Sequence, residues 1–93
     1  MDFNKLQKQV QECDLQKGWV DDTADIVIHM SEELGEVARH ILRKRGYKQE
    51  EYDKEELGDE LTDLLYLIIK LANKEDINLN KKWSKMWKRL EEK

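Results

Sequence analysis

The chain contains no proline, and its four glycines stand at positions 18, 35, 46 and 58. Across most of the remaining sequence, apolar residues recur at intervals of three and four, which is the period of one face of an α-helix. The pattern therefore predicts an all-α protein. With 93 residues the chain has room for a single domain, spanning residues 1–93, whose core is small for its surface.

Four helices are expected, over about residues 2–16, from 22 or 23 to 45, 53–73, and from 78 or 80 onward. Each starts at a residue whose side-chain oxygen suits an N-cap, namely Asp2, Asp22 or Thr23, Asp53, and Asn78 or Asn80. Gly18 and Gly46 follow the first two helices, where a glycine is the commonest stop signal.

Two of these helices each carry a pair of acids three residues apart, Glu33 with Glu36 and Glu60 with Asp63. The full pattern reads E-E-x-x-E, then 23 residues, then E-x-x-D. On a helix, a spacing of three places both members of a pair on one face. The four carboxylates are therefore expected to converge.

The acids stand at the edge of apolar rows. Glu33 interrupts the row Ile26, Met30, Val37 and Ile41, while Glu60 and Asp63 precede Leu64, Leu67 and Leu71, beside an expected inner row of Leu57, Leu61, Leu65 and Ile68. Several ionised carboxylates in a partly dry place are costly unless protons or cations neutralise them. Oxygen-only ligands favour Mg²⁺, Mn²⁺ or Ca²⁺. The competing interpretation is two amphipathic helices with solvated acids.

Some nearby residues have more than one interpretation. His29 and His40 each lie four residues from an acid of the first pair, so they either tune the site or are ordinary exposed or hydrogen-bonded side chains. Gly35 and Gly58 lie inside helices next to the acids, and we expect them to permit a close approach of the two backbones. Cys13 is expected only to pack, since it has no partner for a disulfide.

Composition excludes several classes of function. Charged residues make up 41% of the chain, the formal net charge is −4, and acids and bases are interspersed. No basic face for duplex nucleic acid stands out, so we expect no nucleic-acid partner. The sequence has neither a signal-peptide core nor an apolar run long enough to span a bilayer, so we expect no membrane partner and a cytoplasmic location.

The ordered set KGW, EELGE, DELTDLL and LANKEDINL resembles the MazG family of all-α nucleoside triphosphate pyrophosphohydrolases. The resemblance implies a four-helix MazG-like bundle completed by oligomerisation. It also implies hydrolysis between the α- and β-phosphates of a (deoxy)nucleoside triphosphate, giving the monophosphate and pyrophosphate, in a role such as nucleotide-pool housekeeping.

The resemblance also implies roles for individual residues. Magnesium, with manganese as a substitute, is held by Glu33, Glu36, Glu60 and Asp63. Glu32 is either the base for the attacking water or a ligand of a further ion, or it faces solvent. Trp19 either stacks on the base or covers the core. Lys85 stands near a phosphate-binding lysine of the family, with Arg89 in place of an asparagine.

Two alternatives stay open for the function. Phosphoribosyl-ATP pyrophosphatase shares the acid pattern, but its usual tyrosine–histidine pair after the aspartate is missing here. A non-catalytic helical interaction module with a structural metal ion is the other.

We also expect a homodimer or homotetramer, because Val27, Ile28 and Ile69 lie outside the main apolar rows and need cover. The side chains of Trp83 and Trp87, one turn apart, either anchor a contact with a neighbouring chain or fold onto the chain's own core.

Overall fold

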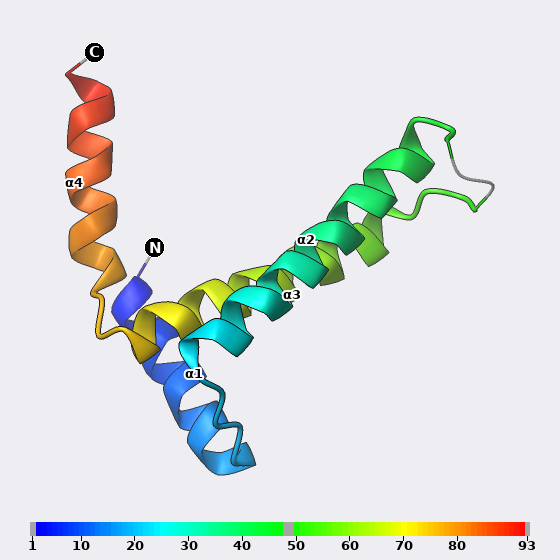
Figure 1. Cartoon of the computed structure of the whole chain (residues 1–93). Coiled ribbons are helices and arrows are strands. Elements are labelled where there is room, and N and C mark those ends of the chain that lie inside the picture. Colours follow the sequence, from blue (N-terminus) through cyan, green and yellow to red (C-terminus); the bar gives the residue numbers. More distant parts are fainter. Residues whose placement is uncertain (1, 48–49, 93) are drawn as a thin grey trace.

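The computed structural model describes residues 2–47 and 50–92, and it consists of four helices (Figure 1). They are α1 (Phe3–Lys17), α2 (Thr23–Lys44), α3 (Lys54–Lys74) and α4 (Leu79–Glu91). No strand occurs among the described residues. The expected all-α class is confirmed.

Side-chain caps define the start of every helix. The carboxylate or amide oxygens of Asp2, Asp22, Asp53 and Asn78 accept backbone N–H groups of the first turn of α1, α2, α3 and α4. Such caps satisfy donors that have no partner within the helix. Gly18 ends α1 in the left-handed conformation, with φ of 70°, which a residue with a side chain rarely adopts. The limits predicted for the first three helices and the start predicted for the fourth agree with the structure to within one or two residues.

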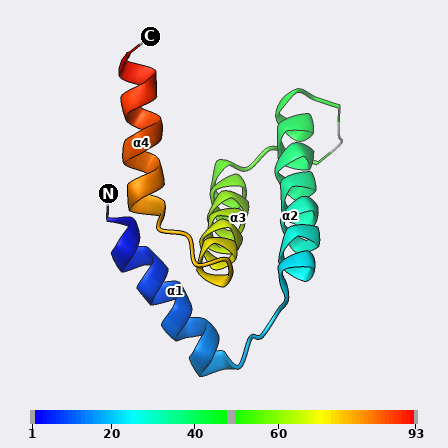
Figure 2. The ribbon, with the colours of Figure 1, turned by 60° about the vertical axis from the view of Figure 1, so that its left-hand side comes forward.

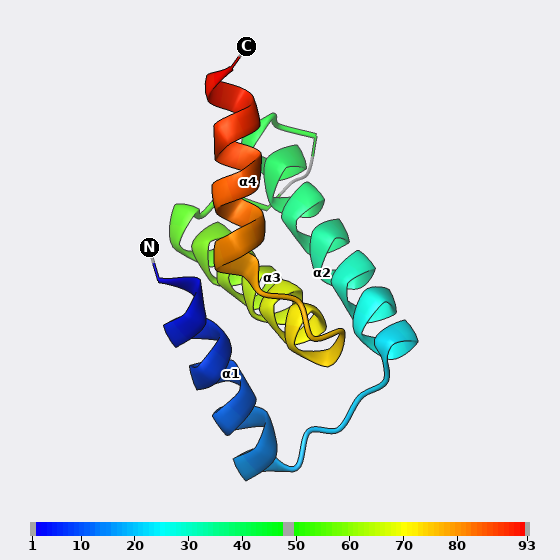
Figure 3. The same cartoon turned by 90° about the vertical axis from the view of Figure 1, so that its left-hand side faces the viewer.

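The helices form an open arrangement instead of a closed bundle. Helix α2 packs antiparallel along α3, and α1 packs against a second side of α3 (Figure 2). Helix α4 has its main contact with α1, and its first turn lies near the start of α1 (Figure 3). The helix extends away from the α2–α3 pair (Figure 1). The molecule is flat as a result, with extents of 43, 42 and 22 Å.

The core is small and centred on α3. Its buried apolar residues are Val10, Ile26, Leu67, Ile69 and Ala72. The prediction that Ile69 lies outside the buried stripe is wrong, because α1 covers that side of α3.

The expected inner row of α3 is not buried in the single chain. Leu61, Leu65 and Ile68 are between 39% and 50% exposed. The packed side of α3 instead includes Leu67, with Leu64 and Leu71 half-buried. The sequence pattern could not separate these rows, because both are apolar and lie side by side on one helix.

The two helical glycines do not sit at a close contact. A side chain added at Gly35 or Gly58 would meet no atom within 4 Å. The expectation that these glycines bring the backbones of α2 and α3 together is therefore wrong within one chain. Both glycines lie on exposed parts of their helices.

A polar joint built on Gln7 ties three segments together. Its side-chain amide N–H group donates to the Asn73 side chain at 3.0 Å and to the Ile77 carbonyl at 2.8 Å. Its side-chain oxygen accepts the N–H of Leu79 at 3.0 Å, and its own carbonyl accepts from the Asn73 amide at 2.9 Å. One residue of α1 thus fixes the end of α3 and the beginning of α4.

Helix α4 has no buried residue. Trp83 contacts Phe3 of α1, with ring centroids 5.5 Å apart, and stacks on Trp87 at 6.3 Å. Both indoles nevertheless remain half-exposed. The tryptophans therefore do not fold onto the core of their own chain.

We expect Gln7→Ala to destabilise the protein by about 1–3 kcal/mol, because it leaves several partners without a hydrogen bond at a partly buried joint. For a domain of this size, each kcal/mol corresponds to about 4–8 °C in melting temperature. Thermal unfolding followed by circular dichroism measures the change. Gln11→Ala, one turn further along the same helix at an exposed position, is the control, and equal effects of the two changes would contradict the role of Gln7.

Candidate active site

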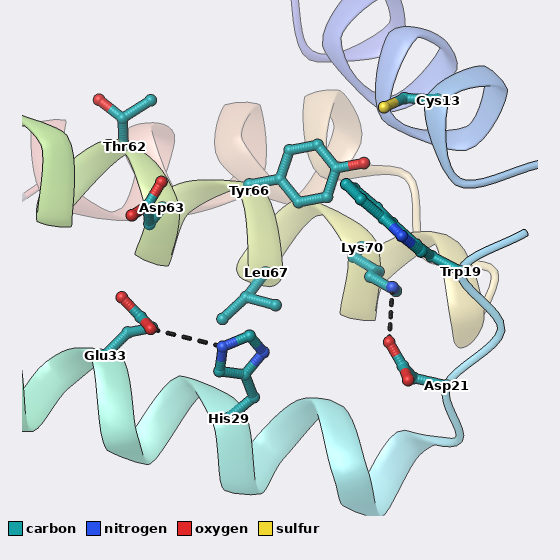
Figure 4. Close-up of a pocket in the computed structure, with 10 residues that line it drawn as sticks. All are labelled: Cys13, Trp19, Asp21, His29, Glu33, Thr62, Asp63, Tyr66, Leu67 and Lys70. Carbon is teal, nitrogen blue, oxygen red and sulfur yellow. Dashed lines mark hydrogen bonds and ion pairs between the residues drawn. The ribbon is translucent and has the colours of Figure 1, made fainter. Parts of the chain in front are cut away.

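A cleft of about 680 Å³ lies between α2, α3 and the end of α1 (Figure 4). One end is acidic, and the other is aromatic and carries a lysine. The residues that line it are Cys13, Trp19, Asp21, His29, Glu33, Thr62, Asp63, Tyr66, Leu67 and Lys70. Residues from three helices and one loop therefore meet around a single space.

Three of the predicted metal ligands come together at the acidic end. Glu33 from α2 and Glu60 and Asp63 from α3 each offer a carboxylate oxygen, and these oxygens lie within 4.8 Å of one another. The packing of α2 against α3 brings acids from the two helices face to face. Such a group of oxygens matches the donor set of a hard divalent cation.

The electrostatics of Glu60 reflect this crowding. A hydrogen bond with Glu33, burial, and the charges of Glu33, Asp63 and Glu36 together raise the pKa of Glu60 from 4.5 to about 7. A carboxyl group among like charges keeps its proton because the ionised form is unfavourable. A bound cation would replace that proton and relieve the repulsion.

The buried oxygen of Glu60 provides a test of whether a metal fits. Its Oε2 atom is buried and has no hydrogen-bond partner among the described residues. Buried polar atoms are normally satisfied, so an acceptor without a partner in an acidic cluster is suited to a cation ligand. The donor set and this free acceptor are both compatible with magnesium or manganese.

The remaining acids of the motif lie further from this group. Glu36 is half-buried, and its carboxylate is 3.9 Å from the Arg39 guanidinium, but its charge still acts on Glu60. Glu32 is exposed and does not line the cleft. Three of the four expected ligands, Glu33, Glu60 and Asp63, therefore form the compact group. The fourth, Glu36, lies outside it but is close enough for its charge to act on Glu60.

The other end of the cleft is built around Trp19. Its indole is half-exposed and lies edge-on to the Tyr66 ring, with centroids 6.5 Å apart. The Tyr66 hydroxyl donates to Asp14 at 2.6 Å. Burial, together with this hydrogen bond, raises the pKa of Tyr66, so the phenol stays neutral. Trp19 thus forms a wall of the cleft.

The sequence interpretation did not include Asp21 and Lys70, which form an ion pair at the aromatic end, with Lys70 Nζ 2.7 Å from the Asp21 carboxylate (Figure 4). A signal for Lys70 was present, because it is a charged residue within the apolar run LLYLIIKLA. The same reasoning identified Glu33 on α2.

The two histidines have different surroundings. His29 lines the cleft, and its Nε2 lies 3.4 Å from the Glu33 carboxylate. His40 is buried away from the cleft, 3.4 Å from the Arg43 guanidinium. Of the two, only His29 is placed to influence the acids of the cleft.

Lys85 and Arg89 do not line the cleft of their own chain. Both are on α4, which is anchored at the beginning of α1, whereas the cleft is formed by the end of α1. Their side chains are exposed. A contact of either residue with a ligand in this cleft therefore requires a second chain.

The raised pKa of Glu60 predicts how the stability of the metal-free protein depends on pH. The folded-state pKa of Glu60 lies above its unfolded value, so protonated Glu60 contributes to the free energy of unfolding. This contribution is complete below about pH 4.5 and is lost as the pH rises through about 7. We expect the melting temperature in a chelator to fall over this range in the wild type. Glu60→Gln should remove part of this fall in melting temperature and should raise the free energy of unfolding by about 1 kcal/mol at pH 8.

Thermal melts of the two proteins between pH 5 and pH 8 test this, with Asp59→Asn, an exposed neighbour on α3, as the control. Melting curves of wild type and Glu60→Gln that shift in parallel across the range would contradict the assignment.

None of the described helices is long and apolar enough to cross a membrane. No curated protein and no solved structure matches the chain. A family model, described as phosphoribosyl-ATP pyrophosphohydrolase, matches residues 4–90, which is nearly the whole sequence. With its all-α fold and its acidic cleft, the chain belongs to the phosphoribosyl-ATP pyrophosphohydrolase family, which acts on pyrophosphate anhydrides and is related to the MazG-like superfamily.

Proposed function

We propose that this protein hydrolyses the α–β phosphoanhydride of (deoxy)nucleoside triphosphates, giving the monophosphate and pyrophosphate, with magnesium as the cofactor. The observation that carries the proposal is the cleft itself, in which Glu33, Glu60 and Asp63 gather at one end and an aromatic wall stands at the other. A nucleotide has the same two-ended chemistry, since its phosphates bind cations and its base stacks on aromatic rings. Nucleotide-pool housekeeping in the cytoplasm is the proposed role.

The residues of the chain have distinct tasks in this proposal. Glu33, Glu60 and Asp63 hold the cation, with Glu36 as a further ligand or a supporting charge. When bound, magnesium neutralises charge on the phosphates and lowers the pKa of water that attacks them. His29 orients the Glu33 carboxylate through their 3.4 Å contact. Trp19 stacks on the base.

Glu32 has a smaller role in the proposal. Its exposed side chain lies outside the group of Glu33, Glu60 and Asp63, and its proposed role is that of a base for the attacking water or a ligand of a further ion. Manganese should replace magnesium, because both ions accept oxygen ligands.

Phosphoribosyl-ATP is the second candidate substrate, and the family match over residues 4–90 favours it. It requires the same cation site, because the reaction again cleaves a pyrophosphate from a nucleotide. The two candidates differ in what must fit at the aromatic end of the cleft. In this chain Leu67 occupies the position four residues after Asp63, where relatives of the MazG type commonly carry a tyrosine.

Pyrophosphate release from a panel of nucleoside triphosphates and from phosphoribosyl-ATP tests the proposal. We expect metal-dependent turnover of at least one of these substrates. Glu60→Ala should reduce kcat by at least about 100-fold, because charge stabilisation by a metal contributes several kcal/mol to such reactions. Asp59→Asn, next to it on α3, should keep the wild-type rate.

Magnesium should also raise the melting temperature of the wild type but not that of Glu60→Ala, because a ligand that binds only the folded state stabilises it. Stabilisation by magnesium without turnover of any substrate would instead favour a non-catalytic module with a structural ion. Equal turnover by Glu60→Ala and wild type would refute the metal assignment.

We propose further that the protein works as a homodimer or a dimer of dimers. One side of the α2–α3 pair exposes six large apolar side chains, which we call the apolar face: Val27, Leu34, Ile41, Leu61, Leu65 and Ile68. Each is between 39% and 58% exposed in the single chain. A contiguous exposed apolar patch of this kind is typical of an interaction surface.

The apolar face is turned away from the cleft. On α3, Leu61 and Ile68 each precede a cleft residue, Asp63 and Lys70, by two positions. Two positions correspond to about 200° around a helix. On α2, Val27 precedes His29 in the same way. A second chain can therefore cover this face without closing the cleft.

An assembly would also give α4 a partner. The helix carries Lys85 and Arg89 on an exposed surface and the half-exposed Trp83 and Trp87 on another. In the proposed assembly the tryptophans anchor α4 on a neighbouring chain, and the two basic residues reach that neighbour's phosphates.

Light scattering at micromolar concentration tests the assembly. We expect a mass of at least twice 11.2 kDa for the wild type. Leu65→Glu should shift the mass toward that of one chain, since it places a charge in the centre of the apolar face. Leu15→Glu is the matched control, because Leu15 is 76% exposed on α1 outside this face. A wild-type mass near 11.2 kDa, with full activity, would overturn the proposal.

A further inference from the structure

Lys70 is a buried lysine whose ammonium group pairs with two carboxylates, one in α1 and one in the loop between α1 and α2. Its side chain is 8% exposed, and its ammonium lies 2.7 Å from Asp21 and 3.8 Å from Asp14. A buried ammonium is unfavourable unless it is paired. The two carboxylates therefore keep Lys70 in place, and Lys70 in turn keeps them in place.

The two carboxylates belong to different segments. Asp14 is in the last turn of α1 and also accepts the Tyr66 hydroxyl. Asp21 is in the loop of residues 18–22, which connects α1 to α2 and is mostly exposed. Lys70 donates a hydrogen bond to Asp21 and so lowers the pKa of its carboxyl group. The Lys70–Asp21 ion pair is a direct side-chain link from this loop to α3.

Trp19 occupies the same loop. Its backbone N–H donates to the Asp14 carbonyl at 2.9 Å, which fixes its main chain to α1. Its ring has no comparable anchor and is half-exposed, in contact with the Tyr66 ring and with the Lys70 ammonium 6.0 Å from its centroid. Figure 4 shows the indole lying beside both side chains at the end of the cleft. The direction of the ring therefore depends on where the loop is held.

We propose that Lys70 is a positioning residue that pins the loop through Asp21 and thereby fixes the Trp19 ring as the base-binding wall of the cleft. Lys70 acts through Asp21 and the ring, without touching the substrate. The part that concerns the base rests on the proposed function, whereas the part that concerns the ring rests on the contacts alone.

This role differs from that of a simple structural ion pair in what it predicts for catalysis. Loss of Lys70 should weaken binding of the base and leave the cation site of Glu33, Glu60 and Asp63 unchanged. A change that removes ground-state binding alone raises KM at constant kcat. A purely structural pair would lower the melting temperature and leave KM unchanged.

Quenching is measured in Trp83→Phe/Trp87→Phe protein, in which Trp19 is the remaining tryptophan of the three, whereas kinetics are measured in the wild-type background, which keeps both tryptophans of the proposed assembly. In each background we compare Lys70→Met, Asp21→Asn and both together. Lys74→Met is the matched control, since it removes a lysine one turn further along α3. Acrylamide quenching of Trp19 fluorescence reports how exposed its ring is. Steady-state kinetics on the best substrate report, through KM, how well the base is bound.

For Lys70→Met we expect the quenching constant to rise about twofold and KM to rise about tenfold, which corresponds to about 1.4 kcal/mol of binding, with kcat within about threefold. Asp21→Asn should act in the same direction. The double variant should be no worse than Lys70→Met, because two residues that act as one unit are not additive. Lys74→Met should behave like the background.

Unchanged quenching in both Lys70→Met and Asp21→Asn would overturn the positioning role. A large effect of Lys70→Met on KM with none from Asp21→Asn would also overturn it, and would mean that Lys70 touches the substrate. Because Lys70 is buried, Asp21→Asn, at a half-exposed side chain, gives the same test without a change in the core. If wild type hydrolyses no nucleotide, the proposed function fails while the quenching experiment still decides the role of Lys70.

Discussion

The repulsion among carboxylates at the contact between α2 and α3 is the constraint on which the rest of the structure depends. Two helices that pack through a small core also bring Glu33, Glu60 and Asp63 within 4.8 Å of one another. The repulsion among these carboxylates opposes the packing of α2 against α3, unless a proton or a cation neutralises part of their charge. The protonation of Glu60 near neutral pH is the metal-free solution, and a divalent cation is the solution that the donor set favours.

The other contacts of the fold hold that crowded register. Gln7 and Asn73 connect α1 to the end of α3, and Lys70 connects the loop before α2 to the C-terminal part of α3. Both joints are made of hydrogen bonds between polar side chains, at places where a larger protein would use apolar packing. A chain of 93 residues with few fully buried side chains has little other means of fixing the ends of its helices.

Much of this could be predicted from the sequence because it is local. The caps at Asp2 and Asp53, the stop at Gly18 and the acid pairs all depend on spacing within a few residues. The parts that were wrong depend on tertiary packing. Whether Leu61 or Leu67 is buried depends on which sides of α3 its neighbouring helices cover, and the same helix period permits both. The pairing of Asp21 with Lys70, 49 residues apart, has no local signal beyond a lysine in an apolar run.

The α2–α3 pair has different chemistry on its two sides, with the cleft and its carboxylates on one and the apolar face on the other. Only the thickness of a helix, about 10 Å, separates the two. The spacing of the acids and the packing of the apolar face are therefore set by the same two backbones. We expect a change in the packing of the apolar face to change the geometry of the carboxylates as well. In the proposed assembly, dilution would alter catalysis as well as association, and specific activity would depend on protein concentration.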